Sequence, residues 1–296
     1  MKFDRVLVTG GAGRLGRYVV EELATRCSVG VLDRSDSLSA PIDFHVDILD
    51  LEALGRAMRG FDAVIHLAAI DSSVTAAPEV VFDTNVRGTW NVLHAARQAG
   101  VGRAVICSSS SAAGIDYTNP RMPPLYLPID EAHPLRPSQA YGLSKQLDEQ
   151  IARSVGRSGG MEVICLRPAW VMFPESMRRV MAERRNEVAP VAAGRHREPW
   201  PLLRSYVAPH DAARAFRLAL EMPGVPHDVF IITAADTFEP EPTLAHLDRT
   251  YGTPIEVRKP DVYARNPRAS AWDITRAREV LGWSPSQDWA ALSGAA

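Results

Sequence analysis

The first half of the chain alternates short apolar runs with longer amphipathic stretches. The apolar runs predict buried strands at 5–8, 29–32, 44–46, 63–67 and 104–107. Between these runs, apolar residues recur at helical spacing over 15–25, 51–58 and 80–99. Strands that alternate with helices are typical of βαβ units. We therefore expect an α/β fold built on a doubly wound parallel sheet of the Rossmann type.

The pattern changes after Cys107. Residues 115–138 contain six prolines and little periodicity, which predicts a long loop over the carboxyl edge of the sheet. A helix is expected over 138–155 and a strand over 161–166, and a strand at 229–233 could rejoin the sheet. We expect a main domain at 1–166 and a smaller C-terminal lobe at 167–296, partly interleaved with it.

Composition narrows the functional classes. The 296 residues carry a formal net charge of −2, and no basic run indicates binding to nucleic acid or to an anionic membrane. The three cysteines are scattered, which favours reduced thiols over disulfides or a metal site. The N-terminus lacks the pattern of a signal peptide and no apolar stretch is long enough to span a membrane, so we expect a cytoplasmic protein.

A glycine-rich loop follows the first predicted strand. Gly10, Gly13 and Gly16 form a G-x-x-G-x-x-G pattern that opens the first predicted helix, together with Arg14 and Leu15. Glycine here permits a tight turn and lets the backbone approach a pyrophosphate, which the first amides of the helix can bind. The loop predicts a dinucleotide site, which makes residues 1–166 an NAD(P)-binding domain.

The second predicted strand ends at an acidic residue, Asp33, 17 positions after Gly16. A carboxylate at this strand end accepts hydrogen bonds from the adenine ribose and repels the 2′-phosphate of NADP, so it favours NAD. Arg34 and Arg14 each carry a charge that could pair with that phosphate. NAD is the expected cofactor, and NADP stays open.

A tyrosine and a lysine lie one helical turn apart at Tyr141 and Lys145. A free tyrosine has a pKa of about 10, and a nearby ammonium together with an oxidised nicotinamide ring would lower that pKa. Such a phenol can take the proton of a substrate hydroxyl while the hydride leaves for the cofactor. The serine run at 108–111 follows the strand that ends at Cys107, where a hydroxyl can hold the reacting oxygen.

Taken in order, these motifs resemble the extended short-chain dehydrogenases/reductases, that is, the NAD-dependent epimerase/dehydratase family. The resemblance covers nearly the whole chain. Its shared features are TGGAGRLG at 9–16, Asp33, Asp47-Ile48, HLAA at 66–69, NVRGT at 85–89, the serine run, YGLSK at 141–145, LRP at 166–168 and LGWSP at 281–285.

The resemblance implies catalytic roles for three residues. Tyr141 would be the base, and Lys145 would hold its pKa down and bind the nicotinamide ribose. The serine that orients the substrate falls on Ser109 when Arg103 and Gly114 stay in register with the family pattern. A shift of one residue gives Ser110 instead, and we take Ser109.

The resemblance also implies a cofactor wall. Asp47 and Ile48 would sit at the adenine, and Asn85 would lie on the helix beside the active site. The residues that would line the dinucleotide are Leu67, Ala68, Ala69 and Pro168.

Two departures from the family pattern bear on the reaction. Dehydratases usually carry an Asp-Glu pair directly after the catalytic hydroxyl residue, where this chain has Ser110 and Ser111. Nucleotide-sugar epimerases usually place an asparagine after the Leu-Arg segment, where this chain continues Pro168-Ala169-Trp170. The first departure disfavours a dehydratase, and the second weakens the case for a nucleotide sugar.

Candidate substrate contacts come from the serine run and from the C-terminal lobe. Ser110 and Ser111 adjoin the catalytic serine, Trp170 could stack on a sugar or fill the core, and Arg204 could bind an acidic group. Further on, His210 and Asp211 are expected to cap a helix over 212–220.

These features predict an NAD(P)-dependent enzyme that oxidises a secondary hydroxyl of a sugar or sugar-derived small molecule. An epimerase that uses transient oxidation relies on the same residues and stays open, as does a ketone reductase with a different pocket lining. A non-catalytic dinucleotide sensor is the alternative from another class, but such proteins tend to lose the tyrosine or the lysine that this chain keeps. The resemblance implies a homodimer formed through the helices at 80–99 and 138–155.

Overall fold

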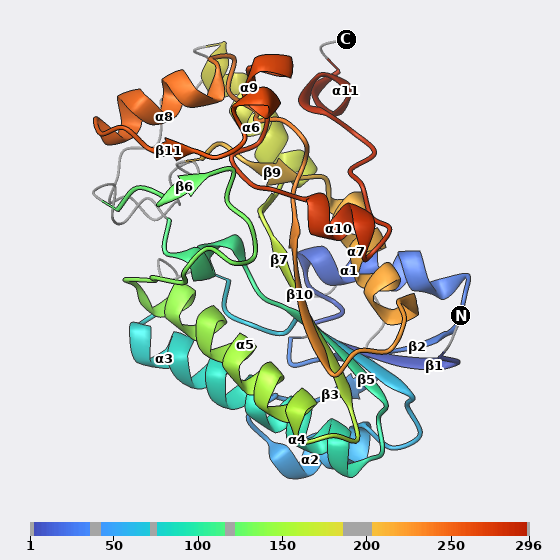
Figure 1. Ribbon diagram of the computed structural model, residues 1–296. Helices are drawn as coiled ribbons and strands as arrows, with labels where there is room; N and C mark the ends of the chain where they lie inside the picture. The colour runs from blue at the N-terminus through green and yellow to red at the C-terminus, as the bar shows by residue number, and fades with distance from the viewer. Residues whose placement is uncertain (1–2, 36–42, 72–75, 116–121, 186–202, 295–296) are drawn as a thin grey trace.

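A seven-stranded, all-parallel sheet forms the centre of the protein (Figure 1). The computed structural model describes residues 3–35, 43–71, 76–115, 122–185 and 203–294. The strand order is β10-β7-β5-β4-β1-β2-β3, so the direction of winding reverses between β1 and β4. This topology confirms the predicted doubly wound α/β fold. The strands are β1 (Arg5–Thr9), β2 (Ser28–Asp33), β3 (Phe44–His45), β4 (Ala63–His66), β5 (Arg103–Cys107), β7 (Glu162–Pro168) and β10 (His227–Ile232).

Helices cover both faces of this sheet. One face carries α2 (Leu51–Ala57), α4 (Gly88–Gln98) and α5 (Ala140–Arg157), and the other carries α1 (Arg14–Ala24), α7 (Pro209–Glu221) and α10 (Thr275–Glu279). Successive residues of β1 point to opposite faces, so Leu7 packs in one core cluster while Val6 and Val8 pack in the other. Burial on both faces explains why the strands are continuous apolar runs.

The helix predicted at 80–99 starts earlier and is interrupted. It begins as α3 (Pro78–Phe82), passes through a π-helical turn η1 (Asp83–Arg87) and continues as α4. A π turn keeps the chain helical, so the apolar spacing along the sequence does not reveal it.

The strand predicted at 229–233 is present as β10 and pairs with β7 at the edge of the sheet. The C-terminal part of the chain therefore contributes β10 to the central sheet and α7 and α10 to one of its faces, while its other elements gather with β6 (Tyr126–Leu127) at the upper end of the molecule in Figure 1. Across the described ranges, no helix is both long and apolar enough to cross a membrane. The upper elements are α6 (Pro174–Arg184), α8 (Thr243–Tyr251), α9 (Pro260–Arg265), α11 (Trp289–Ser293) and two small sheets, β6 with β11 (Glu256–Val257) and β8 (Trp170–Val171) with β9 (Tyr206–Val207).

The proline-rich segment at 115–138 is mostly loop, but it contains β6 and so contributes one strand of a small sheet. Residues 116–121 of this segment lie outside the described residues.

The predicted cap at His210 and Asp211 is wrong. Helix α7 begins at Pro209, whose fixed φ and missing N–H suit the first position of a helix. Both residues therefore lie in the first turn. The Asp211 carboxylate accepts hydrogen bonds from the backbone N–H and the hydroxyl of Ser286, both at 2.8 Å, and so ties the C-terminal segment to α7.

Candidate active site

The carboxyl ends of the parallel strands open into one cavity of about 890 Å³. Residues at or just after the ends of five strands line it: Gly10 after β1, Asp33 on β2, Leu67 after β4, Cys107 on β5 and Pro168 on β7. Ligands of doubly wound sheets bind at this edge, beside the point where the winding reverses.

The glycine loop forms one wall of the cavity. Gly10 has a φ of +68°, and a Cβ there would lie 2.6 Å from the backbone nitrogen of Ala68. A Cβ on Gly16 would lie 2.6 Å from the Gly11 carbonyl carbon and closer still to the Gly10 carbonyl oxygen. Helix α1 begins at Arg14 with Gly13 as its N-cap, so no capping side chain covers its first amides. These amides, together with the Arg14 and Leu15 lining, suit a pyrophosphate.

Both arginines near the loop have acidic partners. Arg34 lies 3.3 Å from the Asp47 carboxylate. Arg14 lies 2.9 Å from Asp71 and stacks over the Phe173 ring at 4.8 Å. Both arginines are therefore partly neutralised by neighbouring acids in solvent-exposed ion pairs.

The predicted cofactor wall surrounds the cavity with one exception. Asn85 is fully buried behind the wall, outside the cavity lining. Its amide accepts a hydrogen bond from the Ile70 N–H at 2.8 Å and donates to the Ile70 carbonyl and the Ser144 hydroxyl, both at 3.0 Å. Asn85 thus ties the segment after β4 to α5. The predicted residues that do line the cavity are Asp33, Arg34, Asp47, Ile48, Leu67, Ala68, Ala69 and Pro168.

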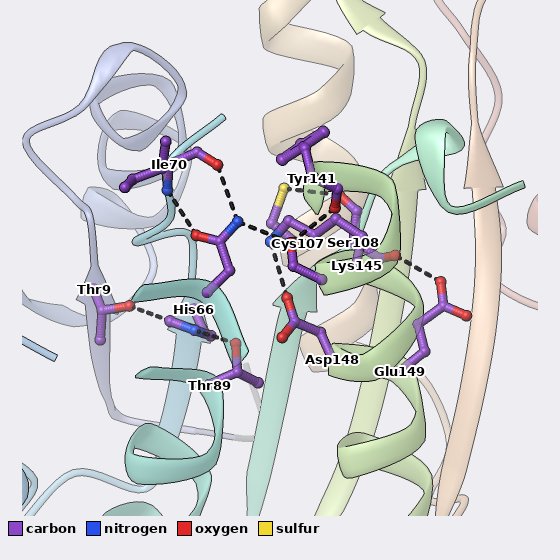
Figure 2. Close-up of polar contacts among 12 residues, drawn as sticks. Thr9, His66, Ile70, Thr89, Cys107, Ser108, Tyr141, Lys145, Asp148 and Glu149 are labelled. Atoms are coloured by element: carbon purple, nitrogen blue, oxygen red, sulfur yellow. Dashed lines mark hydrogen bonds and ion pairs between the residues drawn. The ribbon is translucent and has the colours of Figure 1, made fainter. Parts of the chain in front are cut away.

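Tyr141 and Lys145 both line the cavity from the first turns of α5 (Figure 2). The Lys145 ammonium donates hydrogen bonds to the Cys107 carbonyl at 3.0 Å and to Asp148 Oδ2 at 3.1 Å. It lies 6.0 Å from the centre of the Tyr141 ring. Helix α5 therefore presents a phenol and a buried ammonium together, as the spacing predicted.

The acidity of the phenol reflects opposing effects. Burial raises the pKa of Tyr141 to about 12, while the Lys145 charge and a hydrogen bond with the Ser109 hydroxyl act in the opposite direction. Burial also lowers the pKa of Lys145, but Asp148, Tyr141 and Cys107 together outweigh it, so the pKa of Lys145 lies above its ordinary value. The lysine acts in the predicted direction, but in the protein without cofactor burial outweighs it, so the pKa of Tyr141 lies above its ordinary value.

The serine run divides into different roles. Ser108 borders the cavity, and its hydroxyl donates to Glu149 at 2.6 Å. Ser109 accepts a hydrogen bond from the Ser111 N–H at 3.1 Å, caps the short 3₁₀ helix η2 (Ser110–Ala113) and contacts the Tyr141 phenol. The structure thus brings Ser109 to the tyrosine, and Ser110 and Ser111 also line the cavity.

The C-terminal part of the chain closes the other end of the cavity. Trp170 lines it and packs edge-on against Phe238, so it faces the cavity and the core at once. Arg204 lies outside the lining, 3.3 Å from the Glu239 carboxylate and over the Phe238 ring. The structure therefore does not bring Arg204 to the site.

The sequence analysis missed several lining residues. Thr84 and Cys107 directly precede recognised motifs, and Gln139, which accepts a hydrogen bond from the Tyr141 N–H at 2.7 Å, is the N-cap of α5. Their proximity to motifs was a usable signal. Arg179 and Trp272 carry no such signal, because only the folded chain brings them to the cavity.

Known proteins resemble this chain in sequence and in structure. The chain is 31% identical over 241 residues to an L-arabinose 1-dehydrogenase (NAD(P)(+)) of Haloferax volcanii, and this match covers 78% of this chain and 89% of the relative. It is 29% identical over 320 residues to a UDP-glucose 4-epimerase of Streptomyces lividans, and this match covers 98% of this chain and 94% of the relative. A solved short-chain dehydrogenase/reductase superfamily protein from Agrobacterium tumefaciens, with bound NAD, has a TM-score of 0.72 at 26% identity and covers 98% of this chain and 95% of its own.

The model of the NAD dependent epimerase/dehydratase family matches residues 6–232, most of the chain. The solved relative holds NAD, and the open helix amides and the Asp33 carboxylate of this chain suit NAD, with NADP as the alternative. The chain therefore belongs to the NAD-dependent epimerase/dehydratase family and is an NAD-dependent enzyme of the extended short-chain dehydrogenase/reductase type.

Proposed function

We propose that this enzyme oxidises a secondary hydroxyl of a sugar or sugar-derived substrate. One observation carries the proposal: three groups line the same cavity as the glycine loop. They are the Tyr141 phenol, the Ser109 hydroxyl that is hydrogen-bonded to it, and the Lys145 ammonium. Similarity to a sugar dehydrogenase and to a nucleotide-sugar epimerase supports a carbohydrate substrate.

The proposed roles follow from the chemistry of each group. Tyr141, as phenolate, accepts the proton of the substrate hydroxyl, and Ser109 donates a hydrogen bond to the reacting oxygen. The Lys145 charge stabilises the phenolate and binds the ribose of the cofactor. NAD, when bound, accepts the hydride from the same carbon, so the alcohol becomes a ketone or lactone.

We further propose that residues 167–296 form the substrate-binding lobe. Support comes from Trp170, Ser176, Arg179 and Ser205, which line the cavity from this part of the chain. The cofactor wall, by contrast, is built mainly from residues before 166.

A dehydrogenase is favoured over an epimerase by the segment after β7. It reads Pro168-Ala169-Trp170, without the asparagine usual in nucleotide-sugar epimerases. The epimerase stays as the second candidate, because the Streptomyces lividans relative spans 98% of the chain.

A substrate screen tests the proposal and separates the two candidates. The full-length enzyme is incubated with NAD and with aldoses, uronic acids or nucleotide sugars, and both reduced nicotinamide and sugar products are measured. A dehydrogenase forms reduced nicotinamide in step with oxidised sugar, whereas an epimerase changes the sugar without net reduction. If neither product forms with any carbohydrate, the proposed substrate class is wrong.

We also propose that the chain forms a homodimer through α3, α4 and α5. Support comes from large apolar side chains exposed on these helices, including Phe82, Trp90, which is 49% exposed, and Leu143. Light scattering on the parent protein as it elutes from a size-exclusion column is expected to give the mass of a dimer. Trp90→Glu is expected to give a monomer, whereas the control Leu125→Glu, at a residue 48% exposed outside these helices, stays dimeric. A monomeric parent protein would contradict the proposal.

A further inference from the structure

A buried acid lies directly against the lysine of the active site. Asp148 is fully buried one turn after Lys145 on α5, and its Oδ2 lies 3.1 Å from the Lys145 ammonium. Lys145 itself is only 4% exposed. An ion pair that is shielded from water on both sides acts much more strongly on its surroundings than a surface pair.

Behind Asp148, a chain of hydroxyl groups and one imidazole continues away from the cavity (Figure 2). Burial raises the pKa of Asp148, while the Lys145 ammonium and a hydrogen bond with the Thr89 hydroxyl act in the opposite direction and favour the carboxylate. The Thr89 hydroxyl also lies 3.0 Å from His66 Nε2, and His66 Nδ1 lies 2.7 Å from the hydroxyl of Thr9. All these side chains are buried, so Asp148 is supported from behind by α4 and by two strands.

The position of Asp148 opposes the effect of Lys145 on Tyr141. An ammonium alone would stabilise a phenolate, whereas a carboxylate beside it cancels part of that effect. The separations of 6.0 Å and 3.1 Å put the carboxylate oxygen within about 9 Å of the tyrosine ring centre. At this range, with an effective dielectric constant of about 20, one unit charge changes a pKa by slightly over one unit.

Other groups also face these three side chains. Tyr141 is influenced by Cys107 and by Asp71, which both favour the protonated phenol. His66 approaches Lys145 from β4, and Glu149 approaches Asp148 from the same helix. Among the other acids, Asp71 is largely exposed and Glu149 is paired with Arg167, so Asp148 is the acid in direct contact with the lysine.

We propose that Asp148 is a positioning residue that holds the Lys145 ammonium against the Cys107 carbonyl and cancels part of its charge, so that the lysine stabilises the Tyr141 phenolate less than an unpaired ammonium would. This inference rests on the proposed role of Tyr141 as the base. Oxidised NAD supplies a positive ring when bound, whereas reduced NAD does not. With Asp148 in place, deprotonation of Tyr141 depends more on the charge of oxidised NAD and less on Lys145.

The test follows the ionisation of Tyr141 directly and needs no substrate. Full-length protein is labelled with a carbon isotope at the hydroxyl-bearing carbon of tyrosine, and the Tyr141 resonance is assigned by its loss in Tyr141→Phe. Titration by NMR, with and without NAD, is carried to the highest pH at which the spectrum still shows folded protein. The parent and Asp148→Asn are compared by the fraction of phenolate at each pH, which differs about tenfold for a pKa difference of one unit even below the midpoint. The asparagine keeps an oxygen that can accept from Lys145, so the lysine retains a partner.

We expect the Tyr141 resonance of Asp148→Asn to titrate about one pH unit below that of the parent, in both cofactor states. Asp148→Glu retains the charge and is expected to titrate within a few tenths of a unit of the parent. Glu52→Gln removes an exposed acid on α2 and is expected to cause no shift. If Asp148→Asn does not fold, Asp148→Glu still tests the proposal. The proposal then requires Asp148→Glu to fold and its Tyr141 resonance to titrate at the same pH as that of the parent.

Equal titrations of the parent and Asp148→Asn would overturn the inference, as would a shift to higher pH, which would mean that Lys145 loses its own proton instead. A failure of the proposed function is distinguishable from either result. In that case Tyr141 would titrate as expected, while Tyr141→Phe would leave turnover unchanged.

Discussion

Gly16 and Gly55 allow the same substitution to be tested in two opposite settings. Both glycines lie in helices, Gly16 near the start of α1 and Gly55 inside α2. A Cβ on Gly16 would overlap the carbonyl groups of Gly10 and Gly11, whereas a Cβ on Gly55 would meet no atom within 4 Å. Only the first substitution should disturb the cofactor loop.

The size of the expected loss of stability in Gly16→Ala follows from the rigidity of the contact. The atoms that a Gly16 Cβ would meet belong to the backbone, and real Cβ atoms essentially never approach within 3.0 Å, so α1 or the loop must move. Overpacking of this kind costs about 1–3 kcal/mol of unfolding free energy. Gly55→Ala removes backbone freedom from the unfolded chain without a clash, so we expect a gain of about 0.5–1 kcal/mol.

The assay measures stability and cofactor binding on the same proteins. Urea unfolding gives the free energy of unfolding, and calorimetry gives the affinity for NAD. We expect Gly16→Ala to bind NAD about tenfold more weakly or worse, because a displaced α1 no longer aims its first amides at the pyrophosphate. Gly55→Ala should bind NAD as the parent does. If Gly16→Ala matches the parent in both measurements, the close packing of α1 on the loop does not shape the cofactor site.

Three further predictions concern buried charge, pH and cofactor choice. Arg167→Met leaves Glu149, its partner at 2.7 Å, without a counterion, so urea unfolding should show a loss of about 3–5 kcal/mol; an unchanged midpoint would contradict this. Burial, with the Lys145 charge, lowers the pKa of His66 to about 3, whereas the unfolded value is about 6.5. His66 stays neutral in the fold, so stability should fall by up to about 1.4 kcal/mol per pH unit as pH drops from about 6.5 towards 3, and less steeply in His66→Gln; parallel slopes would contradict this. Asp33→Asn removes the charge that repels a 2′-phosphate, so the ratio of NADP to NAD affinity should rise about tenfold; an unchanged ratio would contradict the assigned position of the ribose.

The features that sequence reasoning predicts well are local. The glycine loop, the strand ends and the Tyr141–Lys145 spacing depend on residues that are near one another along the chain, so their meaning survives without coordinates. Because parallel strands all end at one edge, local motifs at those ends also meet in space. This is why most of the predicted cofactor residues line one cavity.

The features that sequence reasoning misses depend on distant partners. The i,i+3 spacing of Lys145 and Asp148 on the predicted helix indicates a pair, but the sequence does not show that the pair is buried or that Thr89 and His66 lie behind it on other elements. The net effect on the Tyr141 pKa likewise depends on burial, which sequence spacing does not report. Arg204 fails as a substrate candidate for the same reason, because Glu239 and Phe238 hold it outside the cavity.

The most direct test of the central claim compares two tyrosine substitutions. Tyr141→Phe removes the phenol at the cavity, whereas Tyr18→Phe removes one on α1 outside the cavity lining. Both are assayed with the carbohydrate that turns over in the screen, and their affinities for NAD are measured in parallel. We predict that Tyr141→Phe loses about 10²–10⁴-fold in kcat/KM and still binds NAD, while Tyr18→Phe matches the parent. Undiminished turnover by Tyr141→Phe would contradict the account.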